Sequence, residues 1–433
     1  MSAGFSRVRG PNRARTALTL AASAAVAVTM CGVGAASAAP AGQAGAHATA
    51  KQHRFSEAAK LLGATKNADE RAALTDKAIA AAGNNLQTAY HTKPLYDKGI
   101  DGTGTALATI VSYGDKNIKA YIDSYSRSHG LPPADVQILE PAGHVPSCDD
   151  PGVPADCSSW GGETDLDVAM FHTLAPKAKI LVVATPTSET QGIDGFPDMM
   201  KAIDYLADHK AANVISMSLG TPEDDFDNSR QLHDLDAHFK KAVDAGITVT
   251  ASSGDDGSTG KKKDGSEWGK QVVSFPAANS YVTAVGGTVL HLNPDGTRKS
   301  PDDLWSRSGG GVSHEYGIPD WQKEVGKVTH AKGRSLPDIS LLGTSGTSQS
   351  SPLFAAVVDL ASQQAGKGLG FINPALYKLG SGGTASGIVD VTSGNNSYNG
   401  VPGFSAGKGF DIVSGWGTVD AAAFVPALLK QLR

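Results

Sequence analysis

Short apolar runs rich in β-branched residues recur from about residue 106 onward, and segments with helical periodicity separate several of them. The runs that predict strands are Ala106–Tyr113, Val136–Leu139, Ile180–Ala184, Val214–Met217, Ile247–Ala251, Val272–Phe275 and Val282–Val285. Apolar positions recur at the helical spacing over residues 117–129, 163–175, 196–209 and 228–245. Continuous apolar strands alternating with helices are typical of a mostly parallel sheet with helices on both faces. We therefore predict a doubly wound α/β fold, in which ligands bind beyond the carboxyl ends of the strands.

The first 39 residues have the pattern of an export signal. Residues 1–16 contain four arginines and no acidic residue, and an Ala-rich apolar run follows from Ala17 to Ala36. The run ends in Ser37-Ala38-Ala39-Pro40, which is typical of a signal-peptide cleavage site. The pattern predicts a secreted, extracellular protein with no membrane attachment once the signal is removed.

The segment between this signal and the predicted sheet is short. Residues 40–53 are rich in Ala, Gly and Gln without an apolar period, and we expect them to be disordered. Ala and Leu recur at helical spacing over residues 55–82, and Gly83-Asn84-Asn85 is expected to end that helix. We therefore expect residues 40–85 to be a short N-terminal extension or a reduced pro-segment. Residues 86–433 then form the main domain.

Composition and charge exclude several classes of protein. The 433 residues include 38 Lys+Arg and 43 Asp+Glu, a net charge of −5, which argues against a nucleic-acid partner because such proteins need a basic surface. Only 3 cysteines are present, and no Cys-x-x-Cys pair suggests zinc. Cys31 leaves with the signal, so we expect Cys148 and Cys157 to pair in an oxidising compartment, as a local clip.

Three polar motifs carry candidate chemistry, and each has an ordinary structural explanation when it is taken alone. The segment from Ser345 to Pro352 places small residues before a helix that is expected to begin near Ser348, where unpaired backbone N–H groups favour an oxyanion. The ordinary explanation is a Ser/Thr helix cap. Glu163 and Asp167 lie four residues apart, so on a helix they share one face and repel. The ordinary explanation is that acids favour a first helical turn.

The third motif, Ser253-Gly254-Asp255, directly follows a predicted strand and opens a Gly/Lys/Asp-rich stretch, 253–270, that we expect to be a surface loop. Its ordinary explanation is a turn. The three motifs together indicate a serine nucleophile, which needs a base. None of the 12 histidines lies in a His-Gly-Thr setting, and His129-Gly130-Leu131 is the nearest match. Carboxylates are the remaining candidates for the base.

In this combination and order the motifs resemble the sedolisin family, the serine-carboxyl peptidases, over about residues 86–433. Ser348 matches the family's nucleophile, Glu163 and Asp167 its acidic pair, and Asp255 its oxyanion-hole aspartate. Further similarities lie at residues 276–277, 284–288, 309–313 and 337–340. The resemblance implies a subtilisin-like form of the predicted fold and a monomeric enzyme that hydrolyses proteins or peptides.

The resemblance also implies a mechanism. Glu163 would take the proton of Ser348 and return it to the leaving amine, and Asp167 would orient Glu163. The Ser348 N–H and a neutral Asp255 carboxyl would stabilise the oxyanion. Because a carboxyl donates a hydrogen bond only when it is protonated, we expect activity below about pH 5–6.

The C-terminal tail holds a candidate site for one structural Ca²⁺ ion. Asp390 and Asp411 flank a Gly-rich loop that exposes carbonyl oxygens, and calcium prefers six or more hard oxygen ligands. The ordinary explanation is a cluster of Asp/Gly turns. By resemblance to the sedolisin calcium site, the ligands would be the two carboxylates and the carbonyls of Val391, Gly407 and Gly409.

The sequence departs from the family in two places. The family usually carries a long propeptide domain, whereas only about 45 residues lie between the expected cleavage site and Leu86. A Ser-Trp-Gly element is replaced by Ser218-Leu219-Gly220, which changes a wall near the site. Two other functions remain open: a His-dependent protease of the subtilisin type, and a non-catalytic secreted binding protein on the same scaffold.

Overall fold

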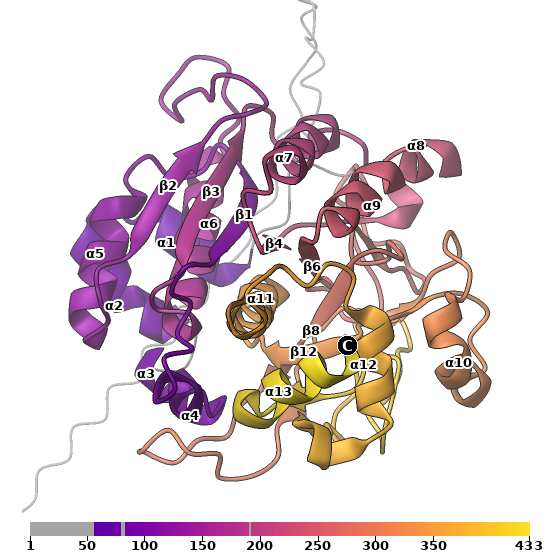
Figure 1. The fold of residues 1–433 in the computed structure, drawn as a ribbon. Helices are drawn as coiled ribbons and strands as arrows, with labels where there is room; N and C mark the ends of the chain where they lie inside the picture. Colours follow the sequence, from indigo (N-terminus) through magenta and orange to yellow (C-terminus); the bar gives the residue numbers. More distant parts are fainter. Residues whose placement is uncertain (1–55, 79–82, 190–191) are drawn as a thin grey trace, which may run out of the picture. The chain divides into compact units, whose positions relative to one another are not determined.

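A central sheet organises the computed structural model, which describes residues 56–78, 83–189 and 192–433 (Figure 1). Seven parallel strands lie in the order β12-β8-β6-β4-β1-β3-β2, and β9 (Asp303–Leu304) pairs antiparallel with β8. The parallel strands are β1 (Ala106–Ser112), β2 (Asp135–Leu139), β3 (Lys179–Thr185), β4 (Val214–Met217), β6 (Thr248–Ser252), β8 (Thr283–Val289) and β12 (Ile339–Leu342). The predicted signal and the segment 40–53 lie outside the described residues.

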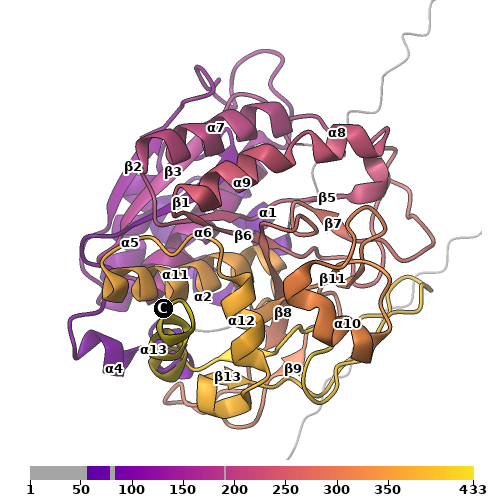
Figure 2. The ribbon, with the colours of Figure 1, turned by 45° about the vertical axis from the view of Figure 1, so that its right-hand side comes forward.

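Every residue of β4 and β6 is buried, as are all but the first residues of β1 and β3. Continuous burial of that kind requires cover on both faces of the sheet. Helices α6 and α11 pack on each other and on the sheet, and α7 and α9 form a second packed pair along it (Figures 1 and 2). The predicted doubly wound, mostly parallel fold is therefore confirmed.

The helices connect the strands as the alternating pattern requires. Their bounds are α1 (Glu57–Ala64), α2 (Ala68–Ala78), α3 (Gly83–Ala89), α4 (Lys93–Tyr96), α5 (Ile118–His129), α6 (Cys157–Leu174), α7 (Phe196–His209), α8 (Ser229–His233), α9 (Asp236–Asp244), α10 (Lys323–Thr329), α11 (Thr347–Ala365), α12 (Asn373–Gly380) and α13 (Ala421–Gln431). Short antiparallel pairs complete the fold: β5 (Thr221–Pro222) with β7 (Ser274–Phe275), β10 (Gly311–Val312) with β11 (Ser335–Leu336), and β13 (Ile388–Val389) with β14 (Thr418–Val419). Among the described residues, no helix combines the length and the apolarity needed to cross a membrane.

Two predictions about the sheet are wrong. The run Val272–Phe275 is not a central strand, because its last two residues form β7 and pair with β5 in a separate ribbon before Pro276, which has no N–H to extend the pairing. The seventh parallel strand is instead β12, which pairs with β8. The four residues of β12 follow Pro337 and Asp338, so the apolar run was too short to stand out in the sequence.

Three further boundaries differ from the prediction. The helix expected over 55–82 is two helices, because the Asn67 side chain accepts hydrogen bonds from the N–H groups of Asp69 and Glu70 and begins α2. Gly83 begins α3 instead of ending a helix, and the segment 228–245 divides into α8 and α9. In the expected surface loop, residues 255–260 are mostly buried and only 261–270 are more open.

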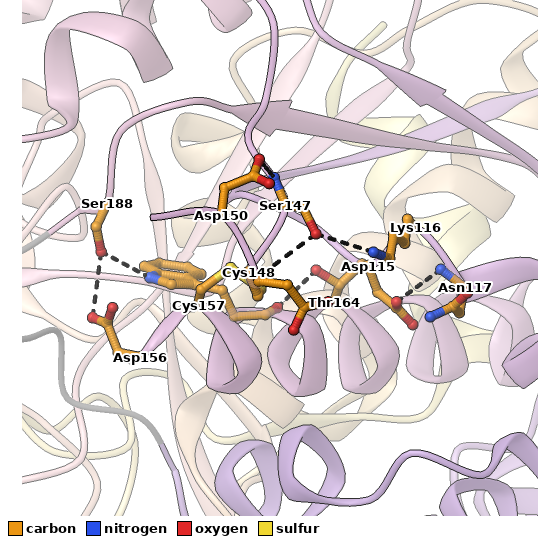
Figure 3. The surroundings of a disulfide bond; sticks show 12 residues. Asp115, Lys116, Asn117, Ser147, Cys148, Asp150, Asp156, Cys157, Thr164 and Ser188 are labelled. Atoms are coloured by element: carbon orange, nitrogen blue, oxygen red, sulfur yellow. Dashed lines mark hydrogen bonds between the residues drawn. A yellow bond between two sulfur atoms is a disulfide. The ribbon is translucent and has the colours of Figure 1, made fainter. Parts of the chain in front are cut away.

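A disulfide joins Cys148 to Cys157, the first residue of α6 (Figure 3). The bond closes the loop that connects β2 to this helix. Trp160, one turn further, donates from its indole N–H to Ser188 Oγ at 3.2 Å. The beginning of α6 is therefore fixed to loops on two sides, and it starts six residues earlier than the sequence pattern predicts.

Several carboxyl groups are buried in this fold. Asp359 of α11 is fully buried and accepts only a hydrogen bond from Thr105 Oγ1, at 2.5 Å, among the described residues. Burial raises the pKa of Asp359 to about 7, and that of Asp225 to about 6. Because a free aspartate titrates near 4, the folded chain binds protons more tightly than the unfolded chain at these positions.

The sign of this linkage predicts that Asp359 contributes most to stability at acidic pH. Stabilisation from protonated Asp359 is complete below about pH 4 and is lost as the pH rises through about 7. We expect Asp359→Asn to flatten the fall in unfolding free energy between pH 4 and pH 7.5, measured by urea unfolding at each pH. Asp123→Asn, at an exposed position of α5, is the matched control and should leave the curve unchanged. Equal slopes for Asp359→Asn and the wild type would contradict this expectation.

Candidate active site

The candidate catalytic residues meet beyond the carboxyl ends of the parallel strands. Ser218 directly follows β4, and Asp255 lies three residues after β6. Ser348 is the second residue of α11, and Glu163 and Asp167 lie on α6, which packs against α11. Four residues that the sequence singled out, Ser348, Glu163, Asp167 and Asp255, are thus brought to one site.

Ser348 lies at a helix N-terminus and remains slightly accessible, with 8% of its surface exposed. Gly346 precedes the helix with φ = 123°, a conformation that favours glycine and turns the chain sharply into α11. The first turn of a helix leaves N–H groups without intrahelical partners, and the helix dipole places positive potential there. A negative oxygen that forms next to the Ser348 hydroxyl would be stabilised by both effects.

Glu163 is fully buried and lies close to Ser348. Burial raises its pKa well above the ordinary value, the neighbouring Asp167 raises that pKa further, the Ser348 hydroxyl lowers it and Asp255 adds a smaller increase. Neither carboxylate oxygen of Glu163 has a partner within hydrogen-bond geometry among the described residues. Catalytic hydrogen bonds are often long before substrate binds.

Asp167 lies one helical turn from Glu163 and is held by hydroxyl groups. Ser218 donates to its Oδ1 at 2.6 Å, and Thr109 of β1 donates to its Oδ2. Burial raises the pKa of Asp167, and these two hydroxyls lower it. Since two buried carboxyls this close share their protons, the pair favours a state with one proton and one negative charge.

Ser218 also connects the acidic pair to the nucleophile's backbone, since its hydroxyl lies 3.2 Å from the carbonyl oxygen of Ser348. Neither Ser218 nor Thr109 was singled out from the sequence as a site residue. The sequence places Ser218 at the end of one predicted strand and Thr109 inside another. The pattern of apolar residues does not show which hydroxyl groups face α6.

Asp255 lies on the other side of the nucleophile. Its Oδ1 accepts hydrogen bonds from the backbone N–H of Thr347 at 2.7 Å and from the Thr347 hydroxyl at 2.9 Å. The Thr347 hydroxyl also lies 3.1 Å from the Gly254 carbonyl oxygen. The loop after β6 is therefore fixed to the first residue of α11, directly beside Ser348.

A cleft opens beside these groups. Residues from the ends of β4 and β6 and from the start of α11 line it, among them Ser218, Leu219, Ser253, Asp255 and Ser348. No histidine lines this cleft among the described residues. His129, the nearest sequence match to a catalytic histidine, lies at the end of α5 with its Nδ1 2.8 Å from the Tyr125 carbonyl oxygen.

Two of the predicted calcium ligands, Asp390 and Asp411, lie at one loop. The N–H of Gly409 donates to Asp390 Oδ2 at 2.8 Å, and the N–H of Gly407 donates to Asp411 Oδ2 at 2.9 Å, so both carboxylates contact one loop. Asp390 Oδ1 is buried without a hydrogen-bond partner among the described residues. Asp411 accepts further bonds from Val413 and Ser414. The unpartnered oxygen and the oxygen-rich surroundings fit a hard cation, which would have to displace some donors from Asp411.

Glu223, Asp224 and His314 form another group with ligand atoms within 4.8 Å of one another. His314 Nδ1 lies 2.8 Å from Glu223 Oε1, and Lys270 forms an ion pair with Asp224. These two partners already compensate the carboxylates, so the group is explained by its own ion pairs.

Comparison with known proteins gives consistent matches. The model of the Subtilase family matches residues 87–378. Kumamolisin of Bacillus sp. (strain MN-32) is 31% identical over 78% of this chain, and sedolisin of Pseudomonas sp. (strain 101) is 29% identical over 82%. The chain spans about 62% of the length of each of these two relatives. Pseudomonas sedolisin, a serine-carboxyl proteinase solved with two molecules of pseudo-iodotyrostatin, superposes with a TM-score of 0.67 at 27% identity, over 80% of this chain and 97% of that one.

The hydroxyls around Asp167 suggest a test that needs no peptide substrate. Thr109→Val keeps the side-chain volume but removes a donor that lowers the pKa of Asp167, so the acidic pair should lose its proton only at higher pH. We expect the acid limb of Ser348 acylation by a reactive ester to move to higher pH. The rate at low pH should fall about 10-fold, since a hydrogen bond to a charged group contributes about 1.5–3 kcal/mol. Thr250→Val, a buried threonine of β6 without a carboxylate partner, is the control. An unchanged pH profile for Thr109→Val would contradict the assignment.

Proposed function

The chain belongs to the Subtilase family and, within it, to the sedolisins, and from this premise we propose that it is a serine-carboxyl peptidase that hydrolyses peptide bonds. The observation that carries the proposal is the position of Ser348, which lies between a buried acidic pair on α6 and Asp255 after β6. The export pattern of residues 1–39 supports action outside the cell, as a monomer on protein or peptide substrates.

In the proposed reaction, the Ser348 hydroxyl oxygen attacks the carbonyl carbon of the scissile peptide bond while Glu163 takes its proton. The tetrahedral oxyanion is stabilised by the Ser348 N–H and by a protonated Asp255 carboxyl. Glu163 then gives its proton to the leaving amine and the C–N bond breaks, which leaves an acyl-enzyme. Water, deprotonated by Glu163, releases the acid and restores Ser348.

Asp167 makes Glu163 a usable base in this scheme. With hydrogen bonds from Ser218 and Thr109, Asp167 holds its place beside Glu163 on the same face of α6. When Glu163 accepts the serine proton, the new carboxyl can share it with Asp167, as the Asp of the Ser-His-Asp arrangement stabilises its partner.

Acidic pH suits each part of this mechanism. A carboxyl at Asp255 donates a hydrogen bond only while it is protonated, and the buried carboxyls Asp167 and Asp359 favour the protonated form. The structure therefore supports optimal activity on the acidic side of neutrality, with the acid limb set by the Glu163–Asp167 pair.

The direct test is digestion of a peptide library between pH 2 and pH 8, with the product ends identified by mass spectrometry. We expect cleavage with an acidic optimum, and loss of at least about 1,000-fold in kcat for Ser348→Ala and Glu163→Gln. Asp255→Asn should lower kcat by about 100–1,000-fold, the typical effect of removing one oxyanion donor. Full activity of Glu163→Gln would favour a His-dependent protease, and absence of cleavage by the wild type at every pH would favour a binding protein.

A structural Ca²⁺ ion is part of the proposal. The Asp390 and Asp411 carboxylates and the carbonyl oxygens of Val391, Gly407 and Gly409 would hold it, and the ion would cross-link the 407–411 loop to the segment after β13.

We expect a chelator to lower the melting temperature by several degrees, because an ion that binds only the folded chain stabilises it by about 2.7 kcal/mol at 100 times its Kd. Asp390→Asn should have the melting temperature of the chelator-treated wild type even without chelator, and the chelator should not lower it further. Asp123→Asn should respond as the wild type does. A wild-type melting temperature that is the same with calcium and with chelator would refute the site.

A further inference from the structure

The N-terminal helix α1 lies directly against α6, the helix that carries Glu163 and Asp167, and α2 packs on α5 and on α1. Figure 1 shows α1 beside α6 and α2 beside α5, and these pairs are in contact. Ala58, Ala59, Leu62 and Ala72 are at most 3% exposed and belong to the same hydrophobic core as the central strands. Residues 56–78 therefore share one continuous core with the rest of the described structure.

The contact between α1 and α6 is made by backbone atoms. A Cβ at Gly162 would lie 1.9 Å from the Ala59 carbonyl oxygen, and a Cβ at Gly63 would lie 2.1 Å from the Ser158 carbonyl oxygen. Only glycine allows helices to approach this closely. Gly162 directly precedes Glu163, so α1 packs on the turn of α6 that carries the proposed base.

Arg71 of α2 fixes the same region through charge. It is 5% exposed, and its Nη1 lies 2.6 Å from Asp165 Oδ2 and 2.8 Å from Asp115 Oδ2. Its guanidinium also lies over the Tyr121 ring, 5.3 Å from the centroid. Asp165 is fully buried on α6, between Glu163 and Asp167 in sequence, and Arg71 is the cation among the described residues that pairs with it.

The beginning of α1 reaches the nucleophile's loop. The Ser56 Cβ lies 2.7 Å, and Asp255 Oδ2 lies 2.8 Å, from the position that a Cβ at Gly346 would occupy. Ser56 also caps α1, since its Oγ accepts from the Ala59 N–H at 3.1 Å. The extension thus contacts α6 through α1 and approaches the beginning of α11 at Gly346.

We propose that residues 56–78 are a permanent part of the catalytic unit and that Arg71 is a positioning residue, which holds α6 so that Glu163 and Asp167 face Ser348. The inference rests on the proposed function. An inhibitor that dissociates would leave Asp165 without its counter-ion and would expose apolar surface along α6. Loss of one partner of a buried ion pair is strongly destabilising, so removal of the segment would destabilise the helix that carries the base.

The first experiment needs no variant. The secreted protein is incubated at acidic pH, separated by gel filtration, and analysed by intact and peptide mass spectrometry, while each fraction is assayed for peptide cleavage. We expect residues 56–78 in equal amount with residues 86–433 in every active fraction, whether or not the chain is cut between them. An active fraction that lacks residues 56–78 would overturn the proposal. Retention of the segment in a folded protein without peptidase activity would instead refute the proposed function alone.

The second experiment tests Arg71 as a positioning residue. Arg71→Met should lower kcat at least 10-fold with KM changed less than 2-fold, because the cleft beside Ser348 contains no residue of α2. Arg71→Lys, which keeps the charge, should recover part of kcat. Arg127→Met is the control, since Arg127 is 69% exposed and only 3.4 Å from Asp69. A folded Arg71→Met with wild-type kcat would overturn the role. If Arg71→Met does not fold, the kcat of Arg71→Lys is measured instead. A wild-type kcat for Arg71→Lys, together with active fractions that lack residues 56–78, would refute the proposal.

Discussion

The burial of two carboxyl groups, one helical turn apart on α6, is the constraint on which the rest of the site depends. Glu163 and Asp167 are both fully buried, and removal from water raises the pKa of each. Such a pair is stable only if it shares a proton and if neighbouring groups supply hydrogen bonds. Ser218 and Thr109 supply them to Asp167, whereas the Glu163 oxygens have no hydrogen-bond partner among the described residues and remain available to Ser348, the proposed nucleophile. Burial of the acidic pair therefore accounts both for the raised pKa values and for the hydrogen bonds that hold Asp167 in place.

The same preference for protonated carboxyls extends through the fold. Asp359 of α11 is buried with a hydroxyl as its partner, and Asp225 is buried with a raised pKa. In contrast, Asp338 is compensated by Arg334 at 2.7 Å, and Asp165 by Arg71. The chain therefore neutralises some buried carboxyls with arginine and leaves others to bind protons. Protonation of the second group becomes more favourable as the pH falls.

Much of this could be predicted from the sequence, for identifiable reasons. Continuous apolar runs such as Ile180–Ala184 are easily recognised as strands, and they predict the doubly wound sheet. The site could be predicted because few other sites combine the residue types of these motifs, which contain Ser348, Glu163, Asp167 and Asp255. The short strand Ile339–Leu342 escaped because four residues carry little pattern. Thr109 and Ser218 escaped because their contacts depend on how α6 packs on the sheet. The contact of Arg71 with Asp165 joins residues 94 apart, which no local pattern encodes.

The central claim, a proton shared by the buried acidic pair, can be measured directly. Carboxyl carbons of selectively labelled Glu and Asp can be followed by ¹³C NMR between pH 3 and pH 9 in the wild type and in Glu163→Gln. The account predicts that one of the two carboxyls stays protonated well above pH 5, and that the partner's titration moves to lower pH when Glu163 is made neutral. Titration of both groups near pH 4, unchanged in the variant, would contradict the account.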